Sequence, residues 1–301
     1  MSNAHREIMK IIPKQSKNWV GDGFNVCPMF GPYAFTSLLS PWLLFDYAPP
    51  KYFPSTKKRL GVGQHPHRGF ETITIAFQGS VEHKDSTGNS GVIGPGDVQW
   101  MTAGRGIIHE EFHSTEFAKT GGEFEMCQLW LNLPSEHKMT KPKYQPIVKE
   151  DIPSVDITAN GEVVGAIRII AGEVDGVKGP AKTHSPVELW DVSIQNGKVP
   201  VEIKIPEDHT LIVFVRRGKI QLLEENKDEA SSENNIVGPQ SVAIMSQKGN
   251  TVCMKALEKN SQVLIMAGES LHDSAALKSI ETMGPVAMKR EKELIQAMSY
   301  Y

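Results

Sequence analysis

Several features that would narrow the function of a chain are missing from this sequence. It has only three cysteines among 301 residues, and none belongs to a C-x-x-C pair. We therefore expect neither a disulfide framework nor a cysteine zinc site, and a reducing cytoplasmic or nuclear setting. No run of eighteen apolar residues occurs, and the first fifteen residues hold no apolar segment with a cleavage pattern. Neither a membrane span nor a secretion signal is expected.

Charge of one sign is also scarce. The formal net charge is −3, which gives no general attraction to nucleic acid or to an anionic membrane. No direct nucleic-acid partner and no membrane partner are therefore expected. The 40% hydrophobic and 22% charged residues are typical of a globular chain that buries a sizeable core.

The sequence does contain a regular series of short predicted strands. Alternating apolar and polar residues predict strands over 70–77, 98–101, 107–112 and 124–133, with glycine-rich turns between them. The same rhythm restarts after residue 150, so two similar β sandwiches or barrels are expected. Residues 133–147 are rich in proline and lysine and predict a linker. Residues 286–300 fit an amphipathic helix.

Two pairs of metal-capable side chains stand at the ends of the first set of strands. His65 and His67 form one pair, and His109 and Glu111 form the other. Residues two apart on a strand point to the same face, so each pair points together. If the two strands pair inside a barrel, four ligands converge on one point.

Three imidazoles and a carboxylate would leave open positions on an octahedral iron(II) or manganese(II) ion. The alternative is that a lone H-x-H motif is merely an exposed strand pair. Glu71 is a rival ligand, because it lies four residues after His67. We expect His83 and His113 at the polar surface or the rim, with a supporting position behind the ligands as the alternative for either. We expect Trp100 and Trp130 in the barrel core. Gln128 either forms hydrogen bonds inside the barrel or is an ordinary core amide whose hydrogen bonds are satisfied.

These motifs resemble the pirin family of the cupin superfamily. The resemblance rests on HPHRGFET at residues 65–72, on GPGDVQWMTAGRGIIHEE at residues 94–111, and on QLWLNLP at residues 128–134. It implies an all-β chain of two tandem cupin (jelly-roll-like) β-barrels with a short C-terminal helix. The implied organisation is a metal-binding barrel over 1–135, a linker over 136–150, a barrel without metal over 151–272, and a tail over 273–301.

The resemblance also implies one mononuclear metal ion held by His65, His67, His109 and Glu111. Iron(II) is the expected ion, with manganese, nickel, copper and zinc as alternatives.

Two functions are known among similar proteins. The first is a quercetin 2,3-dioxygenase that opens a flavonol, and Glu111 would then double as metal ligand and general base. The second is a redox-responsive regulator without turnover, which binds a transcription factor or a metabolic enzyme. The expected partner is accordingly a flavonol-like small molecule or a protein. A third reading is a metal that only stabilises the barrel.

Overall fold

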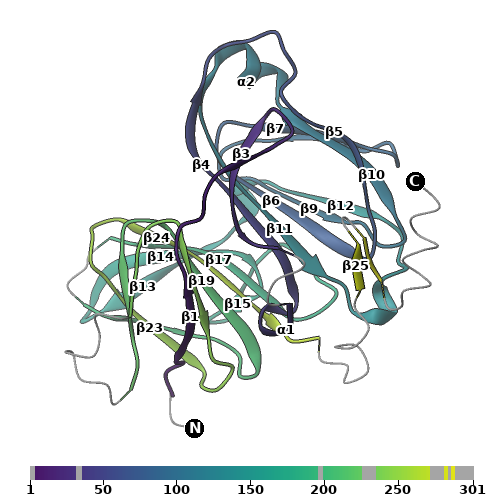
Figure 1. Cartoon of the computed structure of the whole chain (residues 1–301). Coiled ribbons are helices and arrows are strands. Elements are labelled where there is room, and N and C mark those ends of the chain that lie inside the picture. The colour runs from purple at the N-terminus through teal and green to yellow at the C-terminus, as the bar shows by residue number, and fades with distance from the viewer. Residues whose placement is uncertain are drawn as a thin grey trace. The chain divides into compact units, whose positions relative to one another are not determined.

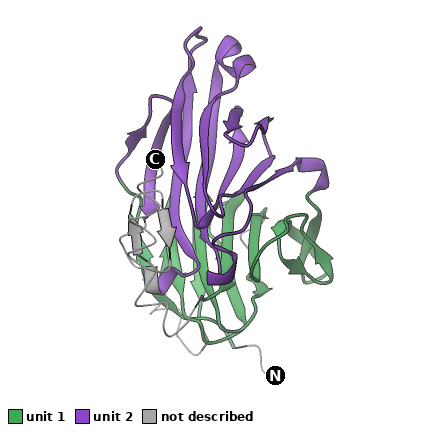
Figure 2. Cartoon of the chain, turned by 90° about the vertical axis from the view of Figure 1, so that its right-hand side faces the viewer, with its two compact units in different colours: residues 1–15, 152–270 green, residues 16–151, 271–301 purple. Residues whose placement is uncertain are grey.

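The alternating sequence of residues 70–78 forms one long strand, β6, in the computed structural model of this chain. The structure describes residues 4–31, 36–195, 199–225, 235–271, 281–283 and 286–288. It divides into two compact units: unit 1 comprises residues 1–15 and 152–270, and unit 2 comprises residues 16–151 and 271–301 (Figure 2). Each unit is built from a seven-stranded and a four-stranded antiparallel sheet, which confirms the prediction of two cupin-type β domains.

Unit 2 contains the strands that the sequence predicted around the two pairs of metal-capable residues. Its seven-stranded sheet has the order β12 (Lys143–Ile147), β9 (Val98–Thr102), β6 (Phe70–Gln78), β11 (Gly122–Asn132), β4 (Trp42–Phe53), β3 (Phe24–Phe30) and β2 (Asn18–Val20) (Figure 1). Its four-stranded sheet has the order β5 (Gly61–His67), β10 (Ile107–His113), β7 (Val81–Asp85) and β8 (Ser90–Ile93).

Unit 1 has the same pattern of sheets. Its seven-stranded sheet has the order β1 (Ile8–Ile12), β22 (Ser241–Met245), β19 (His209–Arg217), β24 (Ser261–Glu269), β17 (Val187–Ile194), β14 (Glu162–Ala171) and β13 (Ser154–Ala159). Its four-stranded sheet has the order β18 (Val201–Lys204), β23 (Thr251–Ala256), β20 (Ile220–Leu223) and β21 (Ile236–Val237).

The remaining elements are short. Two small hairpins pair β15 (Glu173–Val174) with β16 (Val177–Lys178), and β25 (Glu281–Met283) with β26 (Val286–Met288). The helical segments are α1 (Thr36–Leu39), α2 (Thr115–Thr120), and the 3-10 turns η1 (Ser135–His137) and η2 (Lys149–Asp151). None of the helices within the described residues has the length and apolarity that crossing a membrane requires.

The structure differs from the sequence-based prediction at both ends of the chain and in the expected linker. Residues 1–15 were expected in the first domain, but β1 pairs with β22 and belongs to unit 1. The expected linker over 136–150 contains β12, which pairs with β9 throughout its length and extends the seven-stranded sheet of unit 2. Of the predicted helix over 286–300, residues 286–288 form strand β26, and the rest lies outside the described residues.

Burial on β10 alternates along the strand. Ile107, His109, Glu111 and His113 are buried, whereas the residues between them are half-buried. Since successive side chains on a strand point to opposite faces, these four face the interior of unit 2. On β6, Thr74 and Ala76 face the same interior, where Ala76 packs with the apolar cluster around Phe24 and Phe124.

Candidate metal centre

Strands β5 and β10 pair directly, and this pairing brings three histidines together. His109 lies opposite His65 across the ladder, and His67 lies opposite Ile107. One ligand nitrogen from each of His65, His67 and His109 lies within 4.8 Å of the other two. The ring centroids are 4.4 Å apart for His65 and His109, and 4.8 Å for His67 and His109.

A bulge in β5 sets the direction of His65. Between the pairs His65–His109 and Val62–Glu111, β5 carries one residue more than β10. Such a bulge bends the strand and re-aims the neighbouring side chain. The Nδ1–H of His65 donates to the carbonyl oxygen of Gly63, within the bulge, at 2.8 Å. This bond fixes the tautomer and leaves Nε2 of His65 to act as a ligand.

The close approach of β5 to β10 depends on Gly61. A Cβ atom at residue 61 would lie 2.2 Å from the carbonyl oxygen of Glu111 and 2.5 Å from the Cα of Phe112. Any larger residue would therefore push the two strands apart. Gly69, which follows His67 and Arg68 in the HPHRGFET motif, has a different role. Its φ of +83° turns the chain between β5 and β6.

His109 is the most deeply placed member of the cluster. Its side chain is buried, and both of its ring nitrogens lack a hydrogen-bond partner. A buried polar group without a partner is rare and calls for an explanation such as a bound ion. Burial, and then the neighbouring His67 and His65, hold the pKa of His109 well below its usual value. The imidazole is therefore neutral, which is the form that binds metal. The residues thus fit a metal ion.

Glu111 lies next to this cluster but outside it. Its carboxylate is not among the group of ligand atoms within 4.8 Å of one another. The Oε1 atom instead accepts a hydrogen bond from the hydroxyl of Thr74 at 3.2 Å. Burial raises the pKa of Glu111, and His65 and Thr74 partly oppose this rise. Of the four predicted ligands, the structure therefore brings three together and places the fourth beside them.

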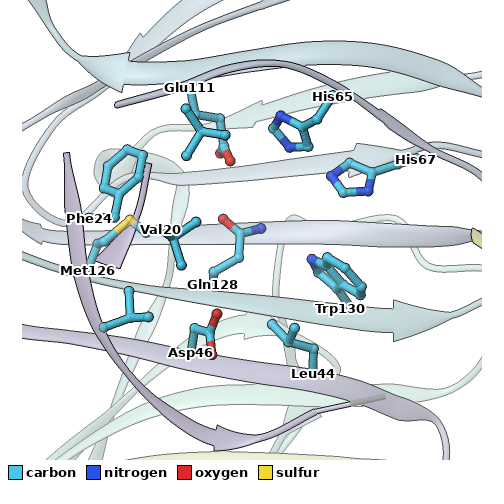
Figure 3. Close-up of a pocket in the computed structure, with 12 residues that line it drawn as sticks. Val20, Phe24, Leu44, Asp46, His65, His67, Glu111, Met126, Gln128 and Trp130 are labelled. Carbon is cyan, nitrogen blue, oxygen red and sulfur yellow. The ribbon is translucent and has the colours of Figure 1, made fainter. Parts of the chain in front are cut away.

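A cavity of about 370 Å³ opens beside the histidines (Figure 3). His65, His67 and Glu111 lie on one side of it, and Leu44 and Asp46 lie on the opposite side. Between these sides lie Gln128 and Trp130. The rest of the lining is apolar and consists of Val20, Phe24, Val26, Val62 and Met126. A mostly apolar cavity with a few convergent polar groups is typical of a small-molecule site.

Two polar residues of the cavity wall face one another across paired strands. Gln128 on β11 is opposite Asp46 on β4. The hydroxyl of Thr74 also lies 2.9 Å from Oε1 of Gln128, so its one proton is shared between two acceptors, Gln128 and Glu111. Burial raises the pKa of Asp46 to about 7. Asp46 was not predicted, although a lone carboxylate in the apolar run from Trp42 to Ala48 could have indicated it.

Other residues considered from the sequence have different positions. Glu71 is buried on β6 and accepts a hydrogen bond from Thr102 at 2.6 Å. It lies three residues before Thr74, and therefore on the opposite face of β6 from the cavity. The turn at Gly69 breaks the parity that had suggested Glu71 as a rival ligand.

The expected surface positions of His83 and His113 are wrong, because both side chains are buried. His83 lies across from Glu111 on the paired strands β7 and β10, and it is hydrogen-bonded to the hydroxyl of Tyr144. His113 donates to the carbonyl of Gly23 at 2.9 Å and stacks on Phe124.

Trp100 and Trp130, both expected in the core, lie in different environments. Trp100 is fully buried, as expected of a core residue. Trp130, however, lines the cavity, where its ring lies edge-on to His67 with the centroids 5.2 Å apart. It also packs on Phe70 at 4.6 Å.

Comparisons with known proteins agree with this architecture. A family model described as pirin matches residues 23–131, and one described as the pirin C-terminal cupin domain matches residues 189–301. A Pseudomonas aeruginosa protein named "Putative quercetin 2,3-dioxygenase PA2418" is 43% identical and covers 97% of this chain and 96% of its own. The chain belongs to the pirin family.

Solved structures extend the comparison. The crystal structure of a quercetin 2,3-dioxygenase from Acinetobacter baumannii has a TM-score of 0.89 at 42% identity, covering 98% of this chain and 96% of its own. The bacterial pirin YhhW from Escherichia coli, solved in complex with nickel(II), has a TM-score of 0.63 at 18% identity. It covers 87% of this chain and 99% of its own, and at that identity it supports the fold alone.

Proposed function

We propose that this chain is a metal-dependent dioxygenase that opens the central ring of a flavonol, of which quercetin is the test substrate. The observation that carries the proposal is the three-histidine cluster beside a largely apolar cavity, with Glu111 at its edge. The names of two relatives that are more than 40% identical support the same reaction class.

The proposed metal ligands are His65, His67 and His109, with Glu111 as the fourth. A set of imidazoles with one carboxylate suits iron(II), and the same donors accept nickel, manganese, copper or zinc. When bound, the ion would supply the Lewis-acid and redox chemistry through which dioxygen reacts with a flavonol.

Glu111 is the proposed base. Burial raises its pKa, so it takes a proton more readily than an exposed carboxylate would. It would remove the proton of the 3-hydroxyl group of the flavonol. The hydroxyl of Thr74 on β6 lies 3.2 Å from Oε1 of Glu111, and the carboxylate of Glu111 points toward the cavity (Figure 3).

The rest of the wall would position and enclose the substrate. Phe24, Met126 and Trp130 offer flat or flexible apolar surfaces to an aromatic ring system. Asp46 offers hydrogen bonds to hydroxyl groups at the end of the substrate that lies away from the histidines, and Gln128 offers them midway between the two sides of the cavity (Figure 3). The apolar lining also keeps water from the reacting atoms.

The proposed reaction balances with dioxygen as the only oxidant. Two carbon–carbon bonds of the central ring break, and the carbon between them leaves as carbon monoxide. Both atoms of dioxygen remain in the product, as the new carbonyl oxygens of an ester and a carboxyl group. The proton taken by Glu111 returns to that carboxyl group.

A matched pair of variants on β10 tests the proposal. Glu111 faces the cavity, whereas Glu110 faces outward and pairs with Arg59 at 2.9 Å. With the iron(II)-loaded protein, quercetin and oxygen, we expect loss of the flavonol absorption band together with oxygen uptake and carbon monoxide release. Glu111→Gln should lower kcat by about 100-fold or more, as for loss of a general base, and Glu110→Gln should not. Absence of quercetin turnover by the metal-loaded wild type would overturn the proposal.

A further inference from the structure

A second group of metal-capable side chains lies in unit 1, away from the cavity. The ligand atoms of His5, Glu202 and Cys253 all lie within 4.8 Å of one another. Glu202 and Cys253 face each other directly across the paired strands β18 and β23. Their neighbours Ile203 and Val252 point into the apolar core, so Glu202 and Cys253 are on the outer face of the four-stranded sheet.

Backbone pairing fixes the position of His5. The N–H of Arg6 donates to the carbonyl of Thr251 at 2.8 Å, and the N–H of Asn250 donates to the carbonyl of Ala4 at 3.0 Å. His5 thereby forms an isolated bridge with Thr251, two residues before Cys253. The Nε2 atom of His5 lies 3.3 Å from Oε1 of Glu202.

Arg6 anchors this segment to unit 1. Its guanidinium group is buried and donates to backbone carbonyls at four places in the chain, which are Pro206, His209, Ser246 and Gly249. His5 is thus held beside the sheet by the backbone and by its neighbour. The three donors are therefore preorganised before any ligand binds.

The donor set is chemically mixed. An imidazole nitrogen, a cysteine sulfur and a carboxylate oxygen are the three ligand types that zinc takes in proteins, and a catalytic zinc site uses three of them with one open position. The Nδ1 atom of His5 is buried without a hydrogen-bond partner, and Cys253 is only 5% exposed. Glu202 is half exposed, which leaves solvent access to the group.

We propose that His5, Glu202 and Cys253 form a second metal site, which takes a thiophilic divalent cation of the zinc class. Its sulfur donor distinguishes it from the metal centre of unit 2, whose proposed ligands are nitrogen and oxygen atoms. Without a cation, burial and the charge of Glu202 raise the pKa of Cys253 to about 11, so the thiol is protonated. This disfavours a reactive thiolate at Cys253, and metal binding would release the proton. The bound cation would tie residue 5 to β18 and β23.

Cobalt(II) separates the two sites, because a thiolate ligand gives a sulfur-to-cobalt charge-transfer band and imidazole ligands do not. We expect the metal-free full-length protein to show this band on titration with cobalt. The variant His109→Ala, which disables the cluster of unit 2, should keep the band and bind about one equivalent of zinc. Adding Cys253→Ser to it should remove the band and the zinc. Cys127→Ala, at a buried cysteine of unit 2, is the matched control and should keep both.

His5→Gln provides an independent check, since it removes a donor from the N-terminal segment without changing the sheet. It should weaken zinc binding by about tenfold or more. Absence of the charge-transfer band in the wild type would overturn the proposal. So would zinc binding in the His109→Ala background that neither Cys253→Ser nor His5→Gln weakens. Because these readouts follow the cysteine and histidine of unit 1 and use no flavonol, they are independent of the dioxygenase proposal.

Discussion

The two β units share one strand order and differ in what fills them. The four-stranded sheet of unit 2 runs β5-β10-β7-β8, and that of unit 1 runs β18-β23-β20-β21. By order along the chain and in the sheet, β18 corresponds to β5 and β23 corresponds to β10. The two units are thus the same framework built twice.

The inward residues of the corresponding strands are different in kind. Those of β5 and β10 include His67, His109 and Glu111, beside a cavity. Those of β18 and β23 belong to a single apolar cluster and are Val201, Ile203, Val252, Met254 and Ala256. The framework therefore permits a metal site without specifying one, and a few inward side chains on two strands decide which unit carries the chemistry.

The edge strands next to β9 and β22 also differ. In unit 2 this position is taken by β12, which follows β11 in the chain. In unit 1 it is taken by β1, from the start of the chain. The buried carboxylate of Glu224 accepts the N–H of Ile8 at 2.6 Å and helps to hold β1 in place. A domain boundary drawn from sequence order alone therefore misplaces the first fifteen residues.

Making unit 2 resemble unit 1 should have the largest effect. His109→Leu places an apolar side chain of similar size where unit 1 has apolar residues. We expect iron(II) affinity to fall by at least about 100-fold, since a ligand is lost. Stability of the metal-free protein should rise by roughly 1 kcal/mol, because a buried imidazole without hydrogen-bond partners is removed. Metal titration and denaturant unfolding measure both quantities.

Met254→Leu, on the corresponding strand of unit 1, is the control for that variant. It is a swap of similar volume and should change stability by less than about 1.5 kcal/mol. Metal affinity at the histidine cluster should stay the same. An unchanged iron affinity in His109→Leu would refute the assignment of His109 as a ligand.

The next largest effect is expected at Arg6, which lies just before the edge strand β1 of unit 1. Arg6→Met removes hydrogen bonds to four backbone carbonyls and leaves them without these donors. We expect a loss of roughly 3 kcal/mol in the free energy of unfolding, measured in denaturant. Lys14→Met, at an exposed position after β1, should cost less than about 0.5 kcal/mol. Equal stability of the two variants would show that Arg6 does not anchor the segment.

Glu71 provides a pH test of the face of β6 that points away from the cavity. Burial raises its pKa from 4.5 to about 7 in the folded protein. The folded state therefore binds the proton more tightly, and stability should fall as pH rises from about 4.5 to 7. Glu71→Gln has no such proton, and its free energy of unfolding should exceed that of the wild type above pH 7 by roughly 3 kcal/mol. Parallel pH profiles of the two proteins would contradict this.

The smallest expected effect concerns the cavity wall opposite the histidines. Asp46→Asn retains the shape of the side chain and removes its charge. If Asp46 only binds a distal hydroxyl group of the substrate, KM should change by about two- to tenfold, with kcat nearly unchanged. In Asp46→Asn, the KM for quercetin and the KM for an analogue that lacks the hydroxyls of one outer ring should then become similar. A large fall in kcat would instead place Asp46 in the chemistry.

Much of the site could be predicted because it depends only on which face of a strand each residue occupies. The i, i+2 spacing in His65/His67 and His109/Glu111 survives folding, since each pair lies on one strand. The strands β6, β9, β10 and β11 lie close to their predicted positions for the same reason. Alternation is a property of neighbouring residues and needs no knowledge of the rest of the chain.

The failures come from features that join distant residues or change parity. The turn at Gly69 moved Glu71 to the other face of β6. His83 is buried by its contact with Tyr144, sixty-one residues away, in a segment expected to be a linker. Asp46 becomes part of the site only because β4 pairs with β11. Spacing along the chain contains none of this information.

The most direct test of the central claim is metal content and quercetin turnover on one sample, for wild type and His65→Ala. The proteins would be loaded with iron(II) without oxygen, freed of excess iron, and then given quercetin and oxygen. We predict about one tightly bound iron per wild-type chain, with loss of the flavonol band, and neither in His65→Ala. Equal iron content and turnover in both proteins would contradict the assignment of the metal centre to the histidine cluster of unit 2.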